Sequence, residues 1–145
     1  LEFLIVDMPP GTGDAQLSLV QSIDIDGVVM VSTPQAVATG DVARGIRMFE
    51  RVNTRVLGIV ENMSSLVCPH CSEEIDVFGQ GGVDRLGSEM DLQVLGRVPL
   101  EPSVRISGDE GSPTVVSNPD SAAAESLRAL TNVVLEGLNI ASATT

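Results

Sequence analysis

Residues 56–61 read Val56-Leu57-Gly58-Ile59-Val60-Glu61, a short apolar run rich in β-branched side chains. Three further runs of this kind occur, at Phe3 to Asp7, Gly27 to Ser32 and Val94 to Val98. None of them alternates cleanly between apolar and polar residues, which is typical of strands that are buried on both faces of a parallel sheet. We therefore predict four such strands.

Segments of helical period lie between these runs. Behind a possible N-cap at Asp41, the apolar residues Val42, Ile46 and Phe49 recur at helical spacing. A second apolar stripe follows Ser121 near the end of the chain and consists of Ala123, Leu127, Leu130, Val134 and Leu138. Strands that alternate with crossover helices predict an α/β fold with a parallel, doubly wound sheet.

The 145 residues, of which 43% are hydrophobic, can form one packed core. We predict one domain over residues 1–138, with irregular loops in the Gly- and Pro-rich stretch from Val98 to Pro119. The tail at 139–145 has little to bury and is predicted to be disordered. Because the chain starts with Leu1 inside a predicted strand, we interpret it as a fragment whose sheet is incomplete at the N-terminus.

The formal net charge of -12 disfavours binding to nucleic acids and to anionic membranes. No apolar stretch reaches the roughly 18 residues of a membrane-spanning helix, and no basic region precedes an apolar segment at the N-terminus. We therefore expect a cytoplasmic protein that binds neither nucleic acid nor membrane. All 8 basic residues are Arg, so the phosphate-binding loop, which requires a Lys, cannot lie within this chain.

Asp7 follows the first predicted strand, at the edge of a parallel sheet that faces ligands. A carboxylate at this position can hold magnesium through water, although a strand that simply meets solvent also fits. The next residues, Met8-Pro9-Pro10-Gly11-Thr12-Gly13-Asp14, combine two prolines with glycines whose backbone N–H groups can approach a phosphate. We interpret Asp7 and Gly11 as candidate catalytic residues, with a structural turn as the alternative.

The chain has 2 cysteines, and both lie in Cys68-Pro69-His70-Cys71, where two thiolates can bind one metal centre. A zinc ion or a four-iron cluster normally needs about four protein ligands, so the pair is half a site unless a second subunit completes it. We interpret His70 as a solvated side chain rather than a third ligand. A redox dithiol and half of a zinc ribbon remain alternatives.

Two parts of the sequence resemble a known family. The segment from Asp7 to Asp14 is similar to switch II of the Mrp/ApbC iron-sulfur cluster carriers, which are P-loop ATPases related to MinD and nitrogenase iron protein. The segments from Leu57 to Ser64, from Val67 to Cys71 and from Phe78 to Gly82 resemble that family again. One departure is Ser72, where the family commonly has Gly.

The resemblance spans roughly residues 1–137 and implies the C-terminal portion of a P-loop ATPase domain, with a Cys loop at 62–80. It implies that Cys68 and Cys71 from each subunit of a homodimer bridge a [4Fe-4S] cluster, which passes to apo iron-sulfur proteins. ATP and Mg²⁺ would act on the cluster through Asp7 in the complete protein. We expect the chain alone to have no appreciable ATPase activity.

Asn62 follows the third predicted strand, and its carboxamide matches the edge of adenine in donors and acceptors. Resemblance to the wider ATPase class implies base recognition there, while a residue chosen for turn geometry is an equally good interpretation. Pro99 and Glu101 lie in a segment, Val98 to Pro102, that resembles the part of the family's chain that passes the nucleotide base.

Two other functions fit part of this pattern. A nucleotide-independent module could hold zinc at Cys68 and Cys71. A MinD/ParA-like positioning ATPase would share the fold. The acidic charge, the Cys pair and the lack of a basic amphipathic C-terminal helix argue against the positioning ATPase.

Overall fold

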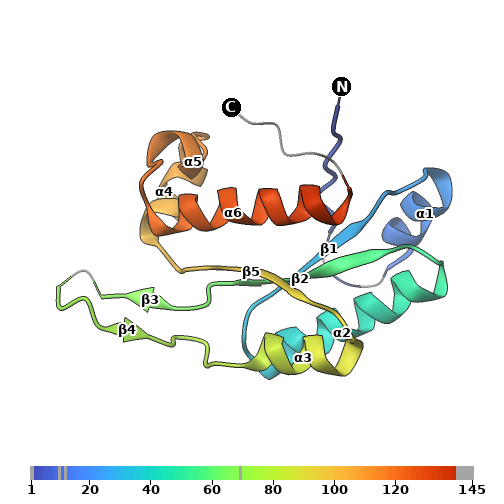
Figure 1. Ribbon diagram of the computed structural model, residues 1–145, viewed down its shortest axis with the longest axis horizontal. Helices are drawn as coiled ribbons and strands as arrows, with labels where there is room; N and C mark the ends of the chain where they lie inside the picture. Colours follow the sequence, from blue (N-terminus) through green and yellow to red (C-terminus); the bar gives the residue numbers. More distant parts are fainter. Residues whose placement is uncertain (1, 10, 12, 69, 140–145) are drawn as a thin grey trace.

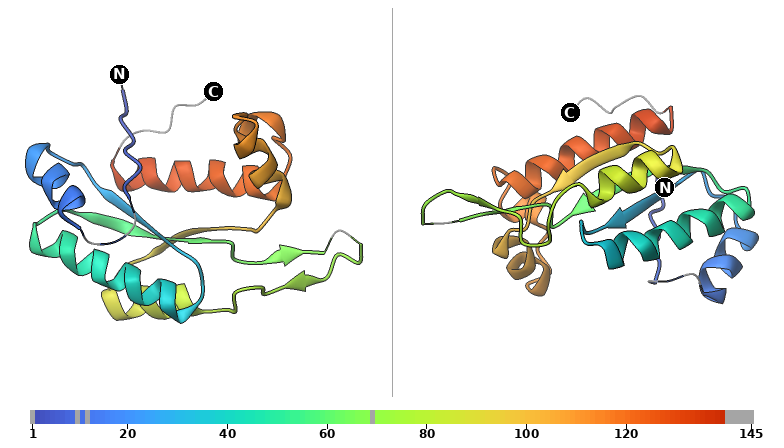
Figure 2. Two further views of the ribbon diagram at one scale, coloured as in Figure 1. Left: turned by 180° about the vertical axis from the view of Figure 1, so that it is seen from behind. Right: turned by 90° about the horizontal axis from the view of Figure 1, so that it is seen from below.

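The computed structural model describes residues 2–9, 11, 13–68 and 70–139 (Figure 1). Three parallel strands form a sheet in the order β1-β2-β5, and their bounds are Val28–Ser32, Val56–Asn62 and Val94–Val98. Helices α2 (Ala36–Arg51) and α3 (Gly82–Met90) cover one face, and α6 (Ala122–Gly137) covers the other (Figure 2). This arrangement confirms the predicted α/β class with a parallel sheet.

The first predicted strand, Phe3 to Asp7, is wrong for this structure. Residues 2–9 contain no strand, and the Leu4 and Ile5 side chains are 72% and 91% exposed. Figure 1 shows this segment running away from the sheet. A strand needs a neighbour that pairs with its backbone groups, and no strand in the described part of the chain pairs with this segment.

The core consists of two clusters, one on each face of the sheet. Leu57 and Val60 of β2 pack toward α6, whereas Ile59 of the same strand packs toward α2 and α3. The prediction of burial on both faces is therefore confirmed for β2. It is wrong for β1, one of the two outer strands of the three described, where Val31 is 55% exposed.

The two predicted N-caps have different outcomes. Ser121 caps α6, since its hydroxyl accepts a hydrogen bond from the Ala124 backbone N–H at 3.1 Å. Asp41 does not cap α2, because that helix begins at Ala36 and Asp41 lies within it, paired with Arg44. Between Pro34 and Asp41 the sequence contains no residue that would prevent the helix from starting at Ala36.

The stretch from Val98 to Pro119 is not irregular, contrary to the prediction. It contains helix α4 (Pro102–Asp109) and the single turn α5 (Thr114–Ser117). Pro102 occupies the first turn of α4, where a missing backbone N–H has no cost. Proline here starts a helix instead of preventing one.

A narrow two-stranded ribbon projects from the sheet within the predicted Cys loop (Figures 1 and 2). Strand β3 (Leu66–Val67) pairs antiparallel with β4 (Glu74–Ile75). We call residues 64–80 the cysteine arm. The remaining helix, α1 (Asp14–Ser22), precedes β1.

The predicted tail lies, apart from Asn139, outside the described residues. Within the described ranges, no helix combines the length and the apolar character needed to cross a membrane.

Candidate metal centre and nucleotide edge

Cys68 and Cys71 lie at the end of the cysteine arm that is farthest from the sheet (Figure 1). The ladder of β3 and β4 extends by one bond, in which the Cys68 N–H donates to the Glu73 carbonyl at 2.9 Å. The turn is closed by the Ser72 N–H, which donates to the Cys68 carbonyl at 2.9 Å. Local backbone bonds therefore hold both cysteines at the tip, while Pro69 lies outside the described residues.

Both thiols are free, with Cys71 exposed and Cys68 half-buried. Hydrogen bonds from the backbone N–H of Cys71, then from that of His70, and then from the Cys71 side chain lower the pKa of the Cys68 thiol. Because the thiolate is the form that binds metals, these donors favour a metal-binding role. His70 itself is exposed, as predicted for a solvated side chain.

Ser72 adopts a left-handed backbone conformation, with φ of 59°. Glycine reaches this region without steric cost, whereas a residue with a Cβ atom is strained there by about 1–2 kcal/mol. The turn after Cys71 therefore explains why glycine suits this position. Serine is accommodated at the same place in this chain.

Among residues 2–9, 11, 13–68 and 70–139, no group of three or more His, Cys, Asp or Glu side chains is arranged to hold a metal ion. The tip of the arm offers the two thiol ligands of Cys68 and Cys71. A centre with four protein ligands at this tip therefore needs two more from outside the described residues.

The base of the arm is bonded to the end of β5. The Ser64 N–H donates to the Val98 carbonyl at 3.1 Å, and the Leu100 N–H donates to the Ser65 carbonyl at 2.7 Å. On the returning side, the Gln80 amide donates to Asp76 at 2.6 Å. These bonds fix the direction in which the arm leaves the sheet.

Glu61 is a site residue that the sequence interpretation missed. It lies near the end of β2 with 5% of its surface exposed, and one carboxylate oxygen is 3.3 Å from Nε of Arg97. Burial raises the pKa of Glu61, an effect that the charge of Arg97 opposes. The sequence did contain a signal for this residue, namely a carboxylate within a run predicted to be buried on both faces. Carboxylates are rarely buried in a protein without a partner.

The loop between Asp7 and Asp14, the segment that is similar to switch II, is bonded to α1 by the buried side chain of Gln16. The Gln16 amide donates to the carbonyl of Pro9 at 2.7 Å and to that of Gly11 at 3.1 Å. Gly11 has φ of 100°, a conformation that suits glycine. Asp7 is exposed and does not follow a strand. Pro10 and Thr12 of this loop lie outside the described residues.

The proposed base-binding residues have different surroundings. The register pairs Asn62 with Val98, so Asn62 and Pro99 lie together at the carboxyl edge of the sheet. Glu101 instead accepts hydrogen bonds on both carboxylate oxygens, from the Ala123 N–H at 2.9 Å and from the Ser103 hydroxyl at 3.1 Å. It stabilises the first turn of α6, where a negative charge is favourable.

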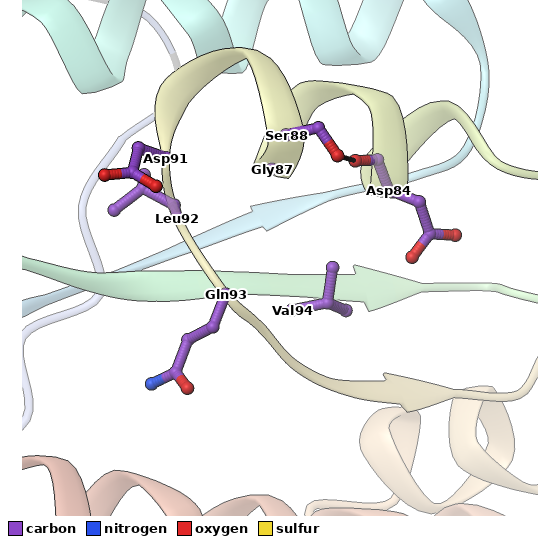
Figure 3. A pocket seen from close by; sticks show the side chains of 7 residues that line it. All are labelled: Asp84, Gly87, Ser88, Asp91, Leu92, Gln93 and Val94. Atoms are coloured by element: carbon purple, nitrogen blue, oxygen red, sulfur yellow. Dashed lines mark hydrogen bonds between the residues drawn. The ribbon is translucent and has the colours of Figure 1, made fainter.

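A pocket of about 620 Å³ lies at the C-terminal end of α3, between that helix and the start of β5 (Figure 3). The Ser88 hydroxyl there donates to the Asp84 carbonyl at 3.0 Å, and the Gln93 amide donates to the Leu57 carbonyl at 3.4 Å. In Figure 3 the Asp84 carboxylate points toward the carboxyl end of β2. Two of the pocket's polar side chains, Ser88 and Gln93, thus bond to the backbone, and Asp84 pairs with Arg97 of β5.

A family model described as ParA, the NUBPL iron-transfer P-loop NTPases, matches residues 1–135. The chain belongs to this family. An Arabidopsis thaliana relative named "Iron-sulfur protein required for NADH dehydrogenase, mitochondrial" is 49% identical over 138 residues, which are 95% of this chain and 44% of the relative. The "Iron-sulfur cluster carrier protein" of Synechocystis is 47% identical over 143 residues, 98% of this chain and 40% of the relative.

The chain thus spans less than half the length of these family members. Among solved structures, a nucleotide-binding protein from Archaeoglobus fulgidus in complex with ADP is 38% identical, with a TM-score of 0.63. The match covers 72% of this chain and 43% of that one. The fold is accordingly the parallel α/β fold of P-loop NTPases.

Proposed function

We propose that this chain is the cluster-holding part of a carrier that binds [4Fe-4S] clusters and transfers them to apo iron-sulfur proteins. The observation that supports this most directly is the placement of two free thiols, Cys68 and Cys71, at the tip of a projecting arm. A cargo held there is accessible to a recipient protein. The name of the Synechocystis relative, an iron-sulfur cluster carrier protein, supports cluster transfer, and the Arabidopsis relative is named as an iron-sulfur protein.

The cluster would be shared by a homodimer. A four-iron cluster takes about four protein ligands, and Cys68 and Cys71 of each chain provide two. A two-fold axis that brings two arm tips together completes the set, because each ligand recurs in the symmetry-related chain. The hydrogen bonds that lower the pKa of Cys68 favour the thiolate that the cluster needs.

ATP and Mg²⁺ would supply the binding energy that changes how tightly the dimer holds its cargo. Asn62 and Pro99 fit a position near the base, because they lie at one edge of the sheet. Glu101 fits less well, since both of its oxygens bond within the protein. Asp7 and Gly11 would face the magnesium ion and the terminal phosphate. The chain has no Lys, so residues beyond it must hold the phosphates.

Anaerobic reconstitution with iron and sulfide tests the cluster site. We expect a broad absorbance band in the blue part of the visible spectrum, about four irons per two chains, and a dimer by light scattering. Replacing Cys68 or Cys71 with Ser should abolish all three. His70→Ala, in the same turn, is the matched control and should keep the cluster. A colourless protein that binds zinc instead would support the zinc-module alternative.

Transfer is tested separately from binding. The reconstituted dimer is mixed with an apo-ferredoxin, and the circular dichroism of the recipient's cluster is followed. Transfer should occur in the presence of a chelator that captures free iron. Cluster appearance only when the chelator is omitted would mean that the cluster is released into solution rather than handed over.

A further inference from the structure

A second pocket, of about 540 Å³, lies where the cysteine arm joins the sheet. Its walls come from the end of β2, both sides of the arm, the start of α3 and the end of β5. Four carboxylates, those of Glu61, Glu74, Asp76 and Asp84, line it together with a single guanidinium, that of Arg97. The pocket therefore carries an excess of negative charge next to the segment that leads to the thiols.

Glu61 leaves one hydrogen-bond acceptor in this pocket unsatisfied. The Glu61 side chain is only 6% exposed, and its Oε1 is 3.3 Å from Nε of Arg97. Its other oxygen, Oε2, is buried and accepts no hydrogen bond. A buried carboxylate oxygen without a donor is energetically unfavourable, and a further cationic donor that reaches it removes that cost. The pocket thus favours a positively charged hydrogen-bond donor.

Arg97 does not prevent such a donor from entering. Its side chain is 48% exposed, and its shorter contact, at 2.5 Å, runs from NH2 to Asp84 rather than to Glu61. The guanidinium can turn toward Asp84 and keep that ion pair while it uncovers Glu61. The hydroxyls of Ser64 and Ser65 also line the pocket and can bond an incoming group.

We propose that this pocket binds an arginine or lysine side chain of the recipient protein and thereby orients the recipient's cysteines toward Cys68 and Cys71. The inference names a partner surface for the carrier, and in that respect it rests on the proposed function. A guanidinium suits the pocket best, because its several N–H groups can reach Glu61 and a carboxylate of the arm, Glu74 or Asp76, together.

The arm between the pocket and the thiols suits an extended recipient segment. Val67 lies opposite Glu74 in the ladder, so both side chains lie on one face of the arm. Val67 is 54% exposed, so an apolar side chain lies on that face between the pocket and the tip. At a rise of about 3.3 Å per residue, the three steps from Ser65 to Cys68 span about 10 Å. The recipient's basic residue should therefore lie about three extended residues from a cluster-binding cysteine.

Titration of the ¹⁵N-labelled chain with N-acetyl-arginine N-methylamide tests the pocket without any cluster. We expect the amide resonances of Ser64, Ser65 and Gly81 to shift. The citrulline analogue has nearly the same shape and no charge, and it should leave them in place. Equal shifts with both probes, or no shift at these residues, would overturn the proposal.

Two variants test whether Glu61 itself binds the arginine probe. Glu61→Gln preserves the shape of the side chain and should weaken the arginine probe roughly tenfold, as expected for a lost charged hydrogen bond. Asp109→Asn removes an exposed carboxylate on α4 that pairs with Arg105, so it makes the same charge change elsewhere and should bind the probe as the wild type does. Equal weakening by both variants would show nonspecific attraction to an acidic protein and would reject the pocket.

A second variant guards against a folding defect in Glu61→Gln. Glu74 and Asp76 are exposed on the arm, so their joint replacement by Gln and Asn leaves the core intact. We expect this double variant to weaken the probe by at least roughly threefold, since two nearby charges are lost. Unchanged binding in the double variant, with dispersed spectra, would overturn the proposal.

Cysteine variants separate this inference from the proposed function. Replacing Cys68 and Cys71 with Ser should abolish the cluster and leave the arginine probe bound with unchanged affinity. Probe binding by a wild-type chain that never holds a cluster would reject the carrier function and keep the cation pocket. A cluster-loaded chain that ignores the arginine probe would reject the pocket and keep the carrier.

Discussion

Residues 4–7 and 58–61 have similar sequences, Leu4-Ile5-Val6-Asp7 and Gly58-Ile59-Val60-Glu61, and opposite environments. Ile5 is 91% exposed, whereas Ile59 is completely buried. The second run lies between β1 and β5 with helices on both faces, and the first pairs with no strand in the described part of the chain. The comparison shows that the neighbours of an apolar run, and not its own residues, determine whether it becomes a buried strand.

The acidic residues that end the two runs differ in the same way. Asp7 is exposed, and Glu61 is 5% exposed with Arg97 beside it. The role of Asp7 in holding magnesium depends on a strand that fixes its direction, so this role stays a prediction. Glu61 already has the environment that Asp7 was predicted to have, at the carboxyl edge of the sheet.

Replacing the central isoleucine of each run should give the largest contrast. Ile59→Ala leaves a cavity in the core, and we expect the free energy of unfolding to fall by about 2–5 kcal/mol. Ile5→Ala removes an exposed side chain and should change it by less than about 0.5 kcal/mol. Urea unfolding followed by far-ultraviolet circular dichroism measures both. A comparable loss in Ile5→Ala would show that residues 3–7 pack in solution, which would remove the contrast.

The glycine of the buried run gives the next largest effect. A Cβ atom at Gly58 would lie 2.6 Å from the Gln93 carbonyl oxygen and 2.7 Å from the Leu95 side chain. Gly58→Ala should therefore cost about 1–3 kcal/mol in urea unfolding, as overpacking does.

Gly40→Ala is the matched control for this change. Gly40 lies within α2, and a Cβ atom there would meet nothing within 4 Å. The control should gain up to about 1 kcal/mol, because alanine is the better helix former. A Gly58 variant as stable as the wild type would mean that β2 and β5 separate easily.

Local sequence patterns explain the part of the fold that could be predicted. The stripe from Ala123 to Leu138 packs on the sheet, and Ser121 caps its helix, because both depend on residues within a few positions of each other. The strands at β1, β2 and β5 were recognisable for the same reason. The helices α4 and α5 were missed because their glycines and prolines suggested loops, although Pro102 favours a helix start.

The candidate site depends on contacts that no local pattern encodes. The sequence shows two thiols close together, but their position on a projecting arm follows from the bonds between Ser64 and Val98 and between Cys68 and Glu73. Glu61, Asp84 and Arg97 come from three separate elements, and only the folded sheet brings them together. Spacing along the chain therefore predicted the ligands and could not predict the pocket beside them.

The smallest expected effect concerns the pH dependence of stability at Glu61. Burial raises the pKa of this carboxyl from its ordinary value of 4.5 in the folded protein. The folded state then binds this proton more tightly than the unfolded state does. Stability contributed by the residue is therefore greatest at or below pH 4.5 and falls as the pH rises through the folded pKa.

Glu61→Gln cannot titrate, so its stability relative to the wild type isolates this term. The variant-minus-wild-type difference in free energy of unfolding should rise as the pH increases from 4.5 and should level off above the folded pKa. Urea unfolding of both proteins at a series of pH values measures it. Arg97→Gln removes the charge that opposes the shift, so this variant should move the same transition in Glu61 to higher pH. A flat difference would mean that water solvates Glu61 freely in solution, and a difference that falls with pH would mean that the charge of Arg97 outweighs the burial.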